Sequence, residues 1–532
     1  MAMAARRAAK AVEMMAWRRV MGCSGSRAGW CGEAMRTTYA MGGERVSESA
    51  SRHVGFGDRL SGMKRSTDRS EFRAAGFRAP WVIFAVGFAL RVLVILVGHT
   101  YRVRTDQADF NFGFEAGRIA RSVATGHGYG NPFNGPSGPT AWLPPLYPLL
   151  MAAAFKVFGV YTRAAALALM VVDSALSAAI APAVYEVAAR CFDARGIARR
   201  GTKVAAPVAL WSAWLWAVYP AALQYAVHWI WEMSLTTCLF AWAIVVVLRL
   251  RGVGEGGEFA SPTHDDGTVV NGAPTEIVER GLGLWFGLGV LWGLIALSNA
   301  SLLLCLPAMM IWVAWPELRK WRLGGKTIVG AALTCVAFAA VLAPWVVRNE
   351  RVMHAFVLTR DNFGVEFYNS SLLSNDGLPW GTAMPLWQGD PVFRKYEQMG
   401  EVKFAQMRQQ EAIANLRSHP GMFARWTLDR FLFFWDGTPH AENGHAAQEY
   451  LRRLSYSFLS ACGLLGLALM LWRRVGGAGL FALVFALVPL VYYVVTVQAR
   501  FRHPIEPLIA VLAVYLFRST EPRKRQSVEG RV

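Results

Sequence analysis

The sequence predicts an all-α, polytopic membrane protein. The chain has 532 residues, of which 54% are hydrophobic and only 17% charged, a smaller charged share than soluble proteins of this length normally carry. It also contains several runs of about 18 or more apolar residues, each long enough to cross a bilayer as a helix. Many of its 21 Trp lie where these runs meet polar sequence, as interfacial anchors do. We expect about ten transmembrane helices, juxtamembrane helices on the outer surface and a small extracytoplasmic region.

The net charge of +19 raises the question of nucleic-acid binding. Arg and Lys gather between and after the apolar runs, and no basic stripe interleaves with a soluble fold. The positive-inside rule explains this distribution better, so we expect the membrane and no nucleic acid as partner.

Composition divides the chain into four parts. We expect a basic, disordered N-terminal tract at 1–78, in which Met63 would make a natural start, and an N-terminal membrane module at 79–348. That module includes a first outer loop at 100–163 and a polar, Gly-rich cytoplasmic linker at 251–280. An extracytoplasmic region follows at 349–452, where the sequence predicts a helix, a turn at 419–421 and a second helix. C-terminal membrane helices and a basic cytoplasmic tail occupy 453–532.

The predicted spans follow in order along the chain: 81–98, 165–188, 205–219, 222–248, 281–297, 300–316, 328–346, 455–472, 478–497 and 504–518. All the basic loops face the cytoplasm if the run 165–188 crosses from outside to inside. A crossing at 144–160 would invert every later loop, so we predict that this segment is a surface or half-inserted helix. Both termini are then cytoplasmic, and the localisation expected is a bacterial inner (plasma) membrane.

The outer stretch 106–148 is the first candidate for chemistry. Its only carboxylates are Asp106, Asp109 and Glu115. The pattern FGFEAGRIARSVATGHG predicts a helix with one apolar face, formed by Phe112, Ala116, Ile119, Ala120 and Val123. Glu115 lies beside that face, at the boundary between water and lipid, where a carboxylate can accept a proton from an attacking hydroxyl. A solvated surface acid is the alternative.

A second candidate is the pair His228 and Glu232, in HWIWEMSL. Glu232 lies about two to three turns below the outer end of the predicted span 222–248. His228 is then one turn above it on the same face. An ionisable residue at that depth is costly unless it faces a cavity or a partner. We predict that the pair contacts substrate; a structural hydrogen bond between helices is the alternative.

Cationic residues at predicted outer ends form the third candidate: Arg348 beside Asn349, and Arg500, Arg502 and His503. Their position runs against the positive-inside rule, which indicates that something anionic compensates. The planar guanidinium suits phosphate oxygens, and a lipid phosphate in the outer leaflet is the obvious ligand. The alternative is pairing with Glu350 or Glu506.

Two soluble nucleotide-binding signatures are missing from the sequence. There is no Walker GxxxxGKS/T, and no GxGxxG opens a soluble βαβ unit. No CxxC or CxxH spacing occurs, so we predict no metal-ligand cluster. An enzyme acting outside the cell membrane would also need an activated donor carried by the membrane.

From about residue 81 to 517 the chain resembles the GT-C membrane glycosyltransferases, the protein mannosyltransferase-like and aminoarabinose-transferase-like enzymes that use polyprenyl-phosphate sugars. Six segments in the family order carry the resemblance: EAGRIARSVATGHGY, WLPPLYPLLMAAAFKVFGV, HWIWEMSL, GLIALSNASLLLCLP, APWVVRN with RDNFGVEFYNS, and RFRHPIEPLIAVL.

The resemblance implies roles for particular residues. The family's acidic pair would fall at Phe112 and Gly113, so its role passes to Glu115 or Asp109, with Asp106 as a further substrate contact. The resemblance makes Lys156, Arg348 and Arg500 contacts of the lipid phosphate, and Glu232 matches an acid that the family often shows.

These observations lead to one preferred hypothesis and two alternatives. The preferred one is an inverting glycosyltransferase that uses a polyprenyl-phosphate sugar and an acceptor that is a lipid, a protein or a glycan. Some relatives use a divalent metal ion, and no other cofactor is expected. A transporter or lipid flippase is the second hypothesis, although the sequence has no clear internal repeat. The third is a lipid-binding relative that has lost activity.

Overall fold

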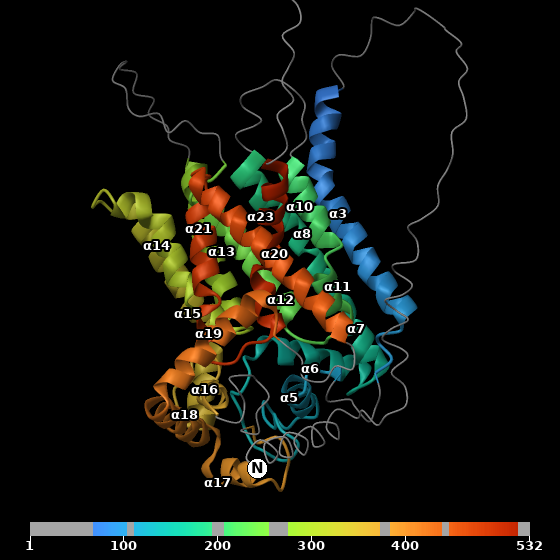
Figure 1. Cartoon of the computed structure of the whole chain (residues 1–532), viewed down its shortest axis with the longest axis vertical. Coiled ribbons are helices and arrows are strands. Elements are labelled where there is room, and N and C mark those ends of the chain that lie inside the picture. The colour runs from blue at the N-terminus through green and yellow to red at the C-terminus, as the bar shows by residue number, and fades with distance from the viewer. Residues whose placement is uncertain are drawn as a thin grey trace, which may run out of the picture.

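The structure is a computed structural model that describes residues 68–103, 111–193, 207–254, 275–372, 384–438 and 446–519 (Figure 1). These residues are mainly helical, and the β-pairing among them is limited to isolated bridges between Gly130 and Pro139 and between Asn134 and Trp387. The N-terminal tract up to residue 67, most of the predicted linker and the C-terminal tail lie outside the described residues. Asp106 and Asp109 do too.

Apolar helices form the main bundle, which fills the upper two-thirds of Figure 1. They are α3 (Asp68–Gly98), α7 (Arg163–Ala178), α8 (Ile180–Ala188), α10 (Pro207–Ala217), α11 (Pro220–Val227), α12 (Met233–Leu250), α13 (Thr275–Ala296), α14 (Cys305–Leu318), α15 (Gly325–Met353), α20 (Ala446–Trp472), α21 (Ala478–Leu487), α22 (Leu490–Val494) and α23 (Glu506–Ser519). Short irregular helical turns, η2 (Ala189–Asp193), η3 (Ala300–Leu302) and η4 (Ala499–Ile505), extend or precede several of them.

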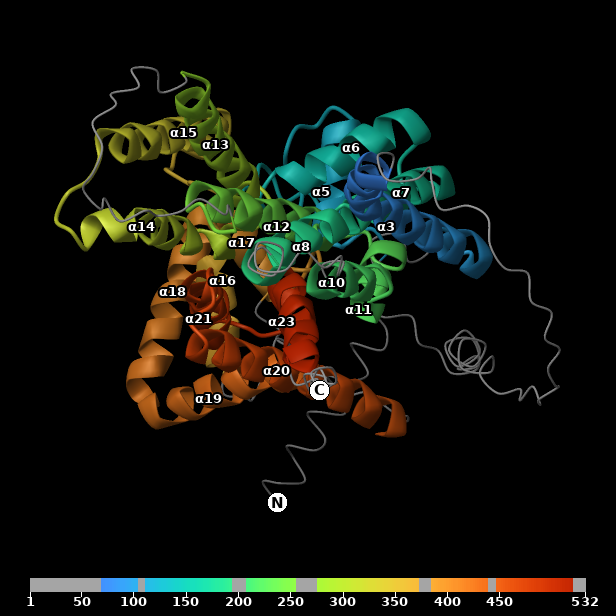
Figure 2. The same ribbon diagram turned by 90° about the horizontal axis from the view of Figure 1, so that it is seen from above.

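Six helices among the described residues are long and apolar enough to cross a membrane, and α7 and α8 count together as one of them. Shorter apolar helices include α10, the last part of α13, and α21 with α22. Each predicted apolar run therefore coincides with a helix or a pair of helices, which confirms the all-α polytopic fold. The most apolar stretch of α12 is 67% buried and that of α3 only 22%. Figure 2 accordingly shows α12 near the centre of the bundle and α3 at its edge.

The helix α6 (Leu146–Phe158) lies across the lower end of the bundle in Figure 1, next to α5 (Glu115–Ala124) and α7. Its 13 residues span about 20 Å, less than the roughly 30 Å of a bilayer core. This geometry agrees with the predicted surface helix at 144–160. Lys156 is exposed in its last turn.

The basic residues meet at the opposite end of the bundle. Arg190 and Arg249 both bind Glu186, at 2.8 and 2.9 Å, and Arg251 donates to the carbonyl of Val313 at 2.8 Å. Arg249 lies in the last turn of α12, one helix length from the lower end at which that helix begins. Arg190, Arg249 and Arg251 therefore lie together at one end of the bundle.

The second outer region packs beneath the bundle as four helices, α16 (Phe363–Ser371), α17 (Pro391–Met399), α18 (Glu401–Ser418) and α19 (Pro420–Asp436) (Figure 1). His419 separates α18 from α19, and Pro420 is the first residue of the second helix, a position where its missing N–H costs nothing. The predicted helix, turn and helix are therefore confirmed. We call the first outer loop together with these four helices the loop-rich end.

Two charged side chains fix the first outer loop to the rest of the protein. The Arg348 guanidinium donates to the carbonyls of Tyr129 and Thr140, the latter at 2.7 Å. The buried Glu401 carboxylate accepts from the Thr140 hydroxyl, from the Ala141 N–H at 2.6 Å and from the Tyr396 hydroxyl at 2.9 Å. A guanidinium on α15 and a carboxylate on α18 therefore hold residues 129–141 between them.

We expect Glu401→Ala to loosen this docking. The change leaves one backbone and two side-chain donors without their acceptor in a buried place, and each such loss costs about 1–3 kcal/mol. The unfolding temperature of the purified protein in detergent should fall, and residues 126–141 should become sensitive to protease. Glu397→Ala, which removes an exposed carboxylate from the neighbouring helix α17, is the control. Equal stability of the two variants would show that the docking does not depend on Glu401.

Candidate functional site

Glu115 is the first residue of α5, and an unusual backbone places it there. Gly113 has φ +71° and Phe114 has φ +49°, a region that L-residues rarely adopt. A Cβ on Gly113 would lie 2.4 Å from Cδ1 of Trp231, so only glycine fits at this contact. Such strain persists where the surrounding structure enforces it, and it is common at functional sites.

Arg500 reaches the same place from the far end of the chain. It lies in η4, and its guanidinium carbon is 4.0 Å from the ring centroid of Trp231 and 5.3 Å from that of Phe501. Its Nε is buried and has no hydrogen-bond partner within the described part of the chain. A half-buried guanidinium with a free donor is suited to bind an oxyanion.

Opposing influences set the proton affinity of Glu115. Burial raises its pKa most, and the negative charge of Glu366 raises it further. Its own backbone N–H, Arg118 and Arg500 act in the opposite direction, but the net pKa stays above the ordinary value. A carboxylate whose pKa is raised toward neutrality is a better general base than an ordinary surface Glu.

The helix containing Glu232 is not continuous, so the predicted geometry of His228 and Glu232 is wrong. α11 ends at Val227, α12 begins at Met233, and Glu232 is the residue before its first turn. The indole rings of Trp229 and Trp231 stack in the break, 4.9 Å apart, where Trp231 also meets Gly113. Glu232 therefore lies at the loop-rich end of α12 and not inside a span, and His228 is exposed before the break.

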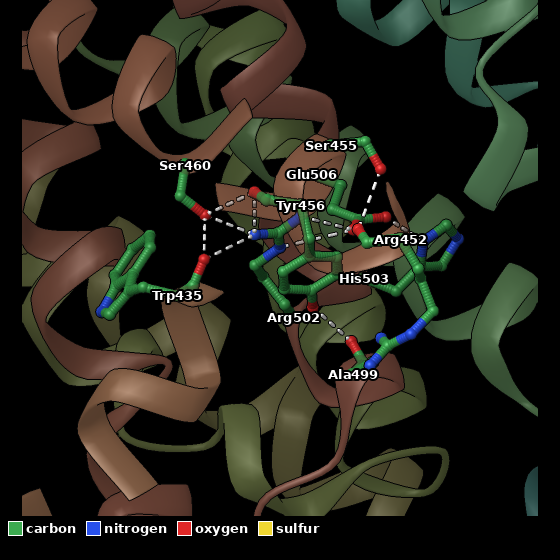
Figure 3. A network of polar contacts seen from close by, with 9 residues as sticks. All are labelled: Trp435, Arg452, Ser455, Tyr456, Ser460, Ala499, Arg502, His503 and Glu506. Atoms are coloured by element: carbon green, nitrogen blue, oxygen red, sulfur yellow. Dashed lines mark hydrogen bonds and ion pairs between the residues drawn. The ribbon is translucent and has the colours of Figure 1, made fainter. Parts of the chain in front are cut away.

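Arg502 and His503 are fully buried and bind Glu506 (Figure 3). The Arg502 Nη2 lies 3.3 Å and the His503 Nδ1 2.7 Å from Glu506 oxygens. Arg502 also donates to the Ser460 hydroxyl of α20 and lies over the ring of Tyr456. The pairing with Glu506 that the sequence left open therefore exists, and these side chains attach the start of α23 to α20.

Arg348 and Asn349 also have protein partners. Arg348 binds the outer loop, and Asn349, fully buried, accepts from Arg348 and donates to the carbonyl of Val357 at 3.0 Å. Lys156 is exposed in the last turn of α6, and Asp106 and Asp109 lie outside the described residues. Among the predicted residues that the structure describes, Glu115 and Arg500 act on one another electrostatically, and Arg500 keeps a free Nε donor.

Three residues at this site were not predicted from the sequence: Trp231, Glu366 and Thr496. Thr496 donates to the Glu366 carboxylate at 3.1 Å, and Trp231 separates Gly113 from Arg500. The tryptophan-rich sequence HWIWEMSL indicated the region. The stacking of a distant arginine on one of its tryptophans, however, leaves no periodic pattern in the sequence.

The described residues do not fit a metal ion. No group of three or more His, Cys, Asp or Glu side chains in the part of the chain that the structure describes could hold one. An apolar cavity between α8, α12 and α23 is lined by none of the candidate residues.

We expect Gly113→Ala to be much less stable than Gly128→Ala. Both glycines have a similar φ, +71° and +77°, so both changes pay about 1–2 kcal/mol for a left-handed alanine. Only position 113 adds a clash, since nothing lies within 4 Å of a Cβ at Gly128. The difference should be about 1–3 kcal/mol in favour of Gly128→Ala, measured by thermal unfolding in detergent. Equal losses would mean that Trp231 does not constrain the start of α5.

No protein-family model matches the chain, and no curated protein matches it in sequence. Solved structures do resemble it. One is an oligosaccharyltransferase from Archaeoglobus fulgidus crystallised with Zn and sulfate, at 13% identity, a TM-score of 0.45 and 83% coverage of this chain. The chain spans only about half of that protein, 49%. Another is ArnT from Cupriavidus metallidurans bound to undecaprenyl phosphate, at 15% identity, a TM-score of 0.32, and coverage of 82% of this chain and 77% of ArnT.

Proposed function

We propose that the protein is a membrane glycosyltransferase of the GT-C type. It moves a sugar from a polyprenyl-phosphate donor to an acceptor at the extracytoplasmic face of a bacterial plasma membrane, with both termini in the cytoplasm. The observation that carries this proposal is that Trp231 adjoins both Gly113, two residues before Glu115, and the Arg500 guanidinium, and that Arg500 acts electrostatically on Glu115. A base and an oxyanion ligand at the end of a membrane bundle are what transfer from a lipid phosphate requires.

Glu115 acts as the general base. The acceptor hydroxyl attacks the anomeric carbon of the donor sugar, and its proton passes to the Glu115 carboxylate. The new bond joins the acceptor oxygen to the anomeric carbon, on the face opposite to the leaving group. Transfer therefore inverts the anomeric configuration.

Arg500 stabilises the leaving group. As the bond between the anomeric carbon and the phosphate oxygen breaks, its electron pair leaves with the polyprenyl phosphate. The guanidinium then neutralises charge that grows on that oxygen, an interaction stronger in the transition state than in the ground state. The free Nε donor of Arg500 supports this role.

The location of the site suits a lipid donor. Glu115 begins a helix packed on α6, which is too short to span and lies across the bundle end. A polyprenyl chain can remain in the bilayer beside the apolar helices while its phosphate reaches this end. Some GT-C enzymes use a divalent metal ion. We assign no step of the reaction to one, because the described carboxylates do not form a ligand set.

We predict that Glu115→Gln lowers sugar transfer by about 10²–10⁴-fold, because the amide cannot accept the proton. In the wild type, transfer should fall as the pH drops through the raised pKa of Glu115, because only the ionised form is a base. The assay measures transfer from a polyprenyl-phosphate sugar by the protein in proteoliposomes. Asp109→Asn, made separately, tests the other carboxylate, and the proposed base is wrong if neither variant is slower.

We predict that Arg500→Met weakens binding of polyprenyl phosphate and slows transfer about 10–100-fold. Arg500→Lys should recover only part, since an ammonium cannot present the planar fork of donors. Arg351→Met, which removes an exposed arginine from the last turn of α15, is the control. Unchanged lipid binding by Arg500→Met would place the phosphate elsewhere.

The same proteoliposomes separate the transferase from a transporter or flippase. A transferase forms product without moving the labelled lipid across the bilayer. Lipid movement without product would favour the flippase, and lipid binding without either would favour a relative that has lost activity.

A further inference from the structure

A short segment leads directly to Arg500, and α16 contacts it. It consists of the last two residues of α22 and of residues 495–498, which connect α22 to η4. The Ser370 hydroxyl of α16 donates to the carbonyl of Val494 at 3.1 Å. The fully buried Arg430 of α19 donates to the carbonyls of Tyr493, at 2.8 Å, and Ser370, at 3.2 Å. We call residues 493–498 the linking segment.

Glu366 adds the contact nearest to the site. It lies in the first turn of α16, where the helix dipole favours a negative charge. Its carboxylate accepts from the Thr496 hydroxyl at 3.1 Å, and Thr496 is 4% exposed and lies four residues before Arg500. The same carboxylate acts electrostatically on Glu115.

A residue just before α16 is hydrogen-bonded to the first outer loop, which Arg348 and Glu401 hold. The N–H of Asp361, just before the helix, donates to the carbonyl of Ala141 at 3.0 Å. Gly364 lets α16 approach α18, since a Cβ there would lie 2.0 Å from the carbonyl oxygen of Ala405. Glu366 is thus presented by a helix that contacts the first outer loop, α18 and the linking segment.

We infer that Glu366 is a positioning residue of the proposed transferase site: its bond to Thr496 sets the linking segment and hence Arg500, and its charge acts on the base Glu115. This inference rests on the proposed function and assigns a second carboxylate to the site. Glu366 does not touch the reacting atoms. It acts on Arg500 indirectly, through its hydrogen bond to Thr496, and on Glu115 through its electrostatic field.

The charge role is tested by Glu366→Gln. The amide oxygen can still accept from Thr496, so Arg500 keeps its place while the negative charge is lost. Removing a like charge favours ionised Glu115, so the acidic limb of the kcat profile should move to lower pH. The groups that remain around Glu115 are Arg118 and Arg500, both cationic. Glu366→Asp, which restores the charge, should return the limb toward its original position.

The positioning role is tested by Thr496→Val. This change removes the hydroxyl and keeps the Glu366 charge, so the acidic limb should stay in place. Binding of polyprenyl phosphate should weaken and the KM for the donor should rise several-fold, because Arg500 is no longer held. Binding is measured without sugar transfer, so this arm does not depend on turnover. Glu350→Gln removes an exposed carboxylate at the end of α15 and is the control for both arms.

The outcomes separate the inference from the proposed function. If the wild type transfers sugar but Glu366→Gln leaves the acidic limb unmoved and Thr496→Val binds the lipid normally, the inference is overturned and the proposed function stands. If the wild type neither binds polyprenyl phosphate nor transfers sugar, the proposed function is wrong, and this inference, which rests on it, is wrong too. A limb shift in one variant and a binding loss in the other support the inference.

Discussion

The docking of residues 129–141 between Arg348 and Glu401 is the contact on which the loop-rich end depends. Burying a carboxylate is unfavourable, and burial raises the pKa of Glu401, but three donors compensate by binding its two oxygens. The donors belong to the outer loop and to Tyr396, so the carboxylate is satisfied only when the loop is in place. A buried charge of this kind is a strong constraint, because its partners cannot be exchanged for water.

The position of the base follows from that docking and from an aromatic contact. Phe112 is fully buried against Phe155 and Tyr161, with ring centroids 5.2 and 5.3 Å away, and Trp231 occupies the space that a side chain at position 113 would need. Neither position could hold an acid in this conformation. The two positions where the GT-C resemblance expects acids are therefore used for packing, and Glu115 is the first acid of the described part of the first outer loop.

The fold was largely predictable because membrane helices are encoded locally. Long apolar runs, basic loops and the Pro420 helix start are each read from a few neighbouring residues, and the short surface helix α6 followed from the loop charges. The break before α12 was missed, since the run 222–248 is mainly apolar and the interruption coincides with the stacking of Trp229 on Trp231, which packs against the distant Gly113.

The site was predicted less well, for a physical reason. Three arginines at predicted outer ends look alike in sequence: Arg348, Arg500 and Arg502. In the structure Arg348 binds loop carbonyls, and Arg502 binds Glu506 and Ser460. Of the three, Arg500 keeps a free Nε donor. What separates them is the set of partners supplied by distant segments. Glu366 and Thr496 escaped notice for the same reason, because 130 residues separate the two ends of their hydrogen bond.

The central claim is that Arg500 receives the phosphate of a polyprenyl-phosphate donor beside Glu115. The most direct measurement is a cryo-electron microscopy structure of the protein with polyprenyl phosphate in lipid nanodiscs. We expect phosphate oxygens within hydrogen-bonding distance of the Arg500 guanidinium, which stacks on Trp231. A phosphate bound away from Arg500, with Glu115 remote from it, would contradict the account.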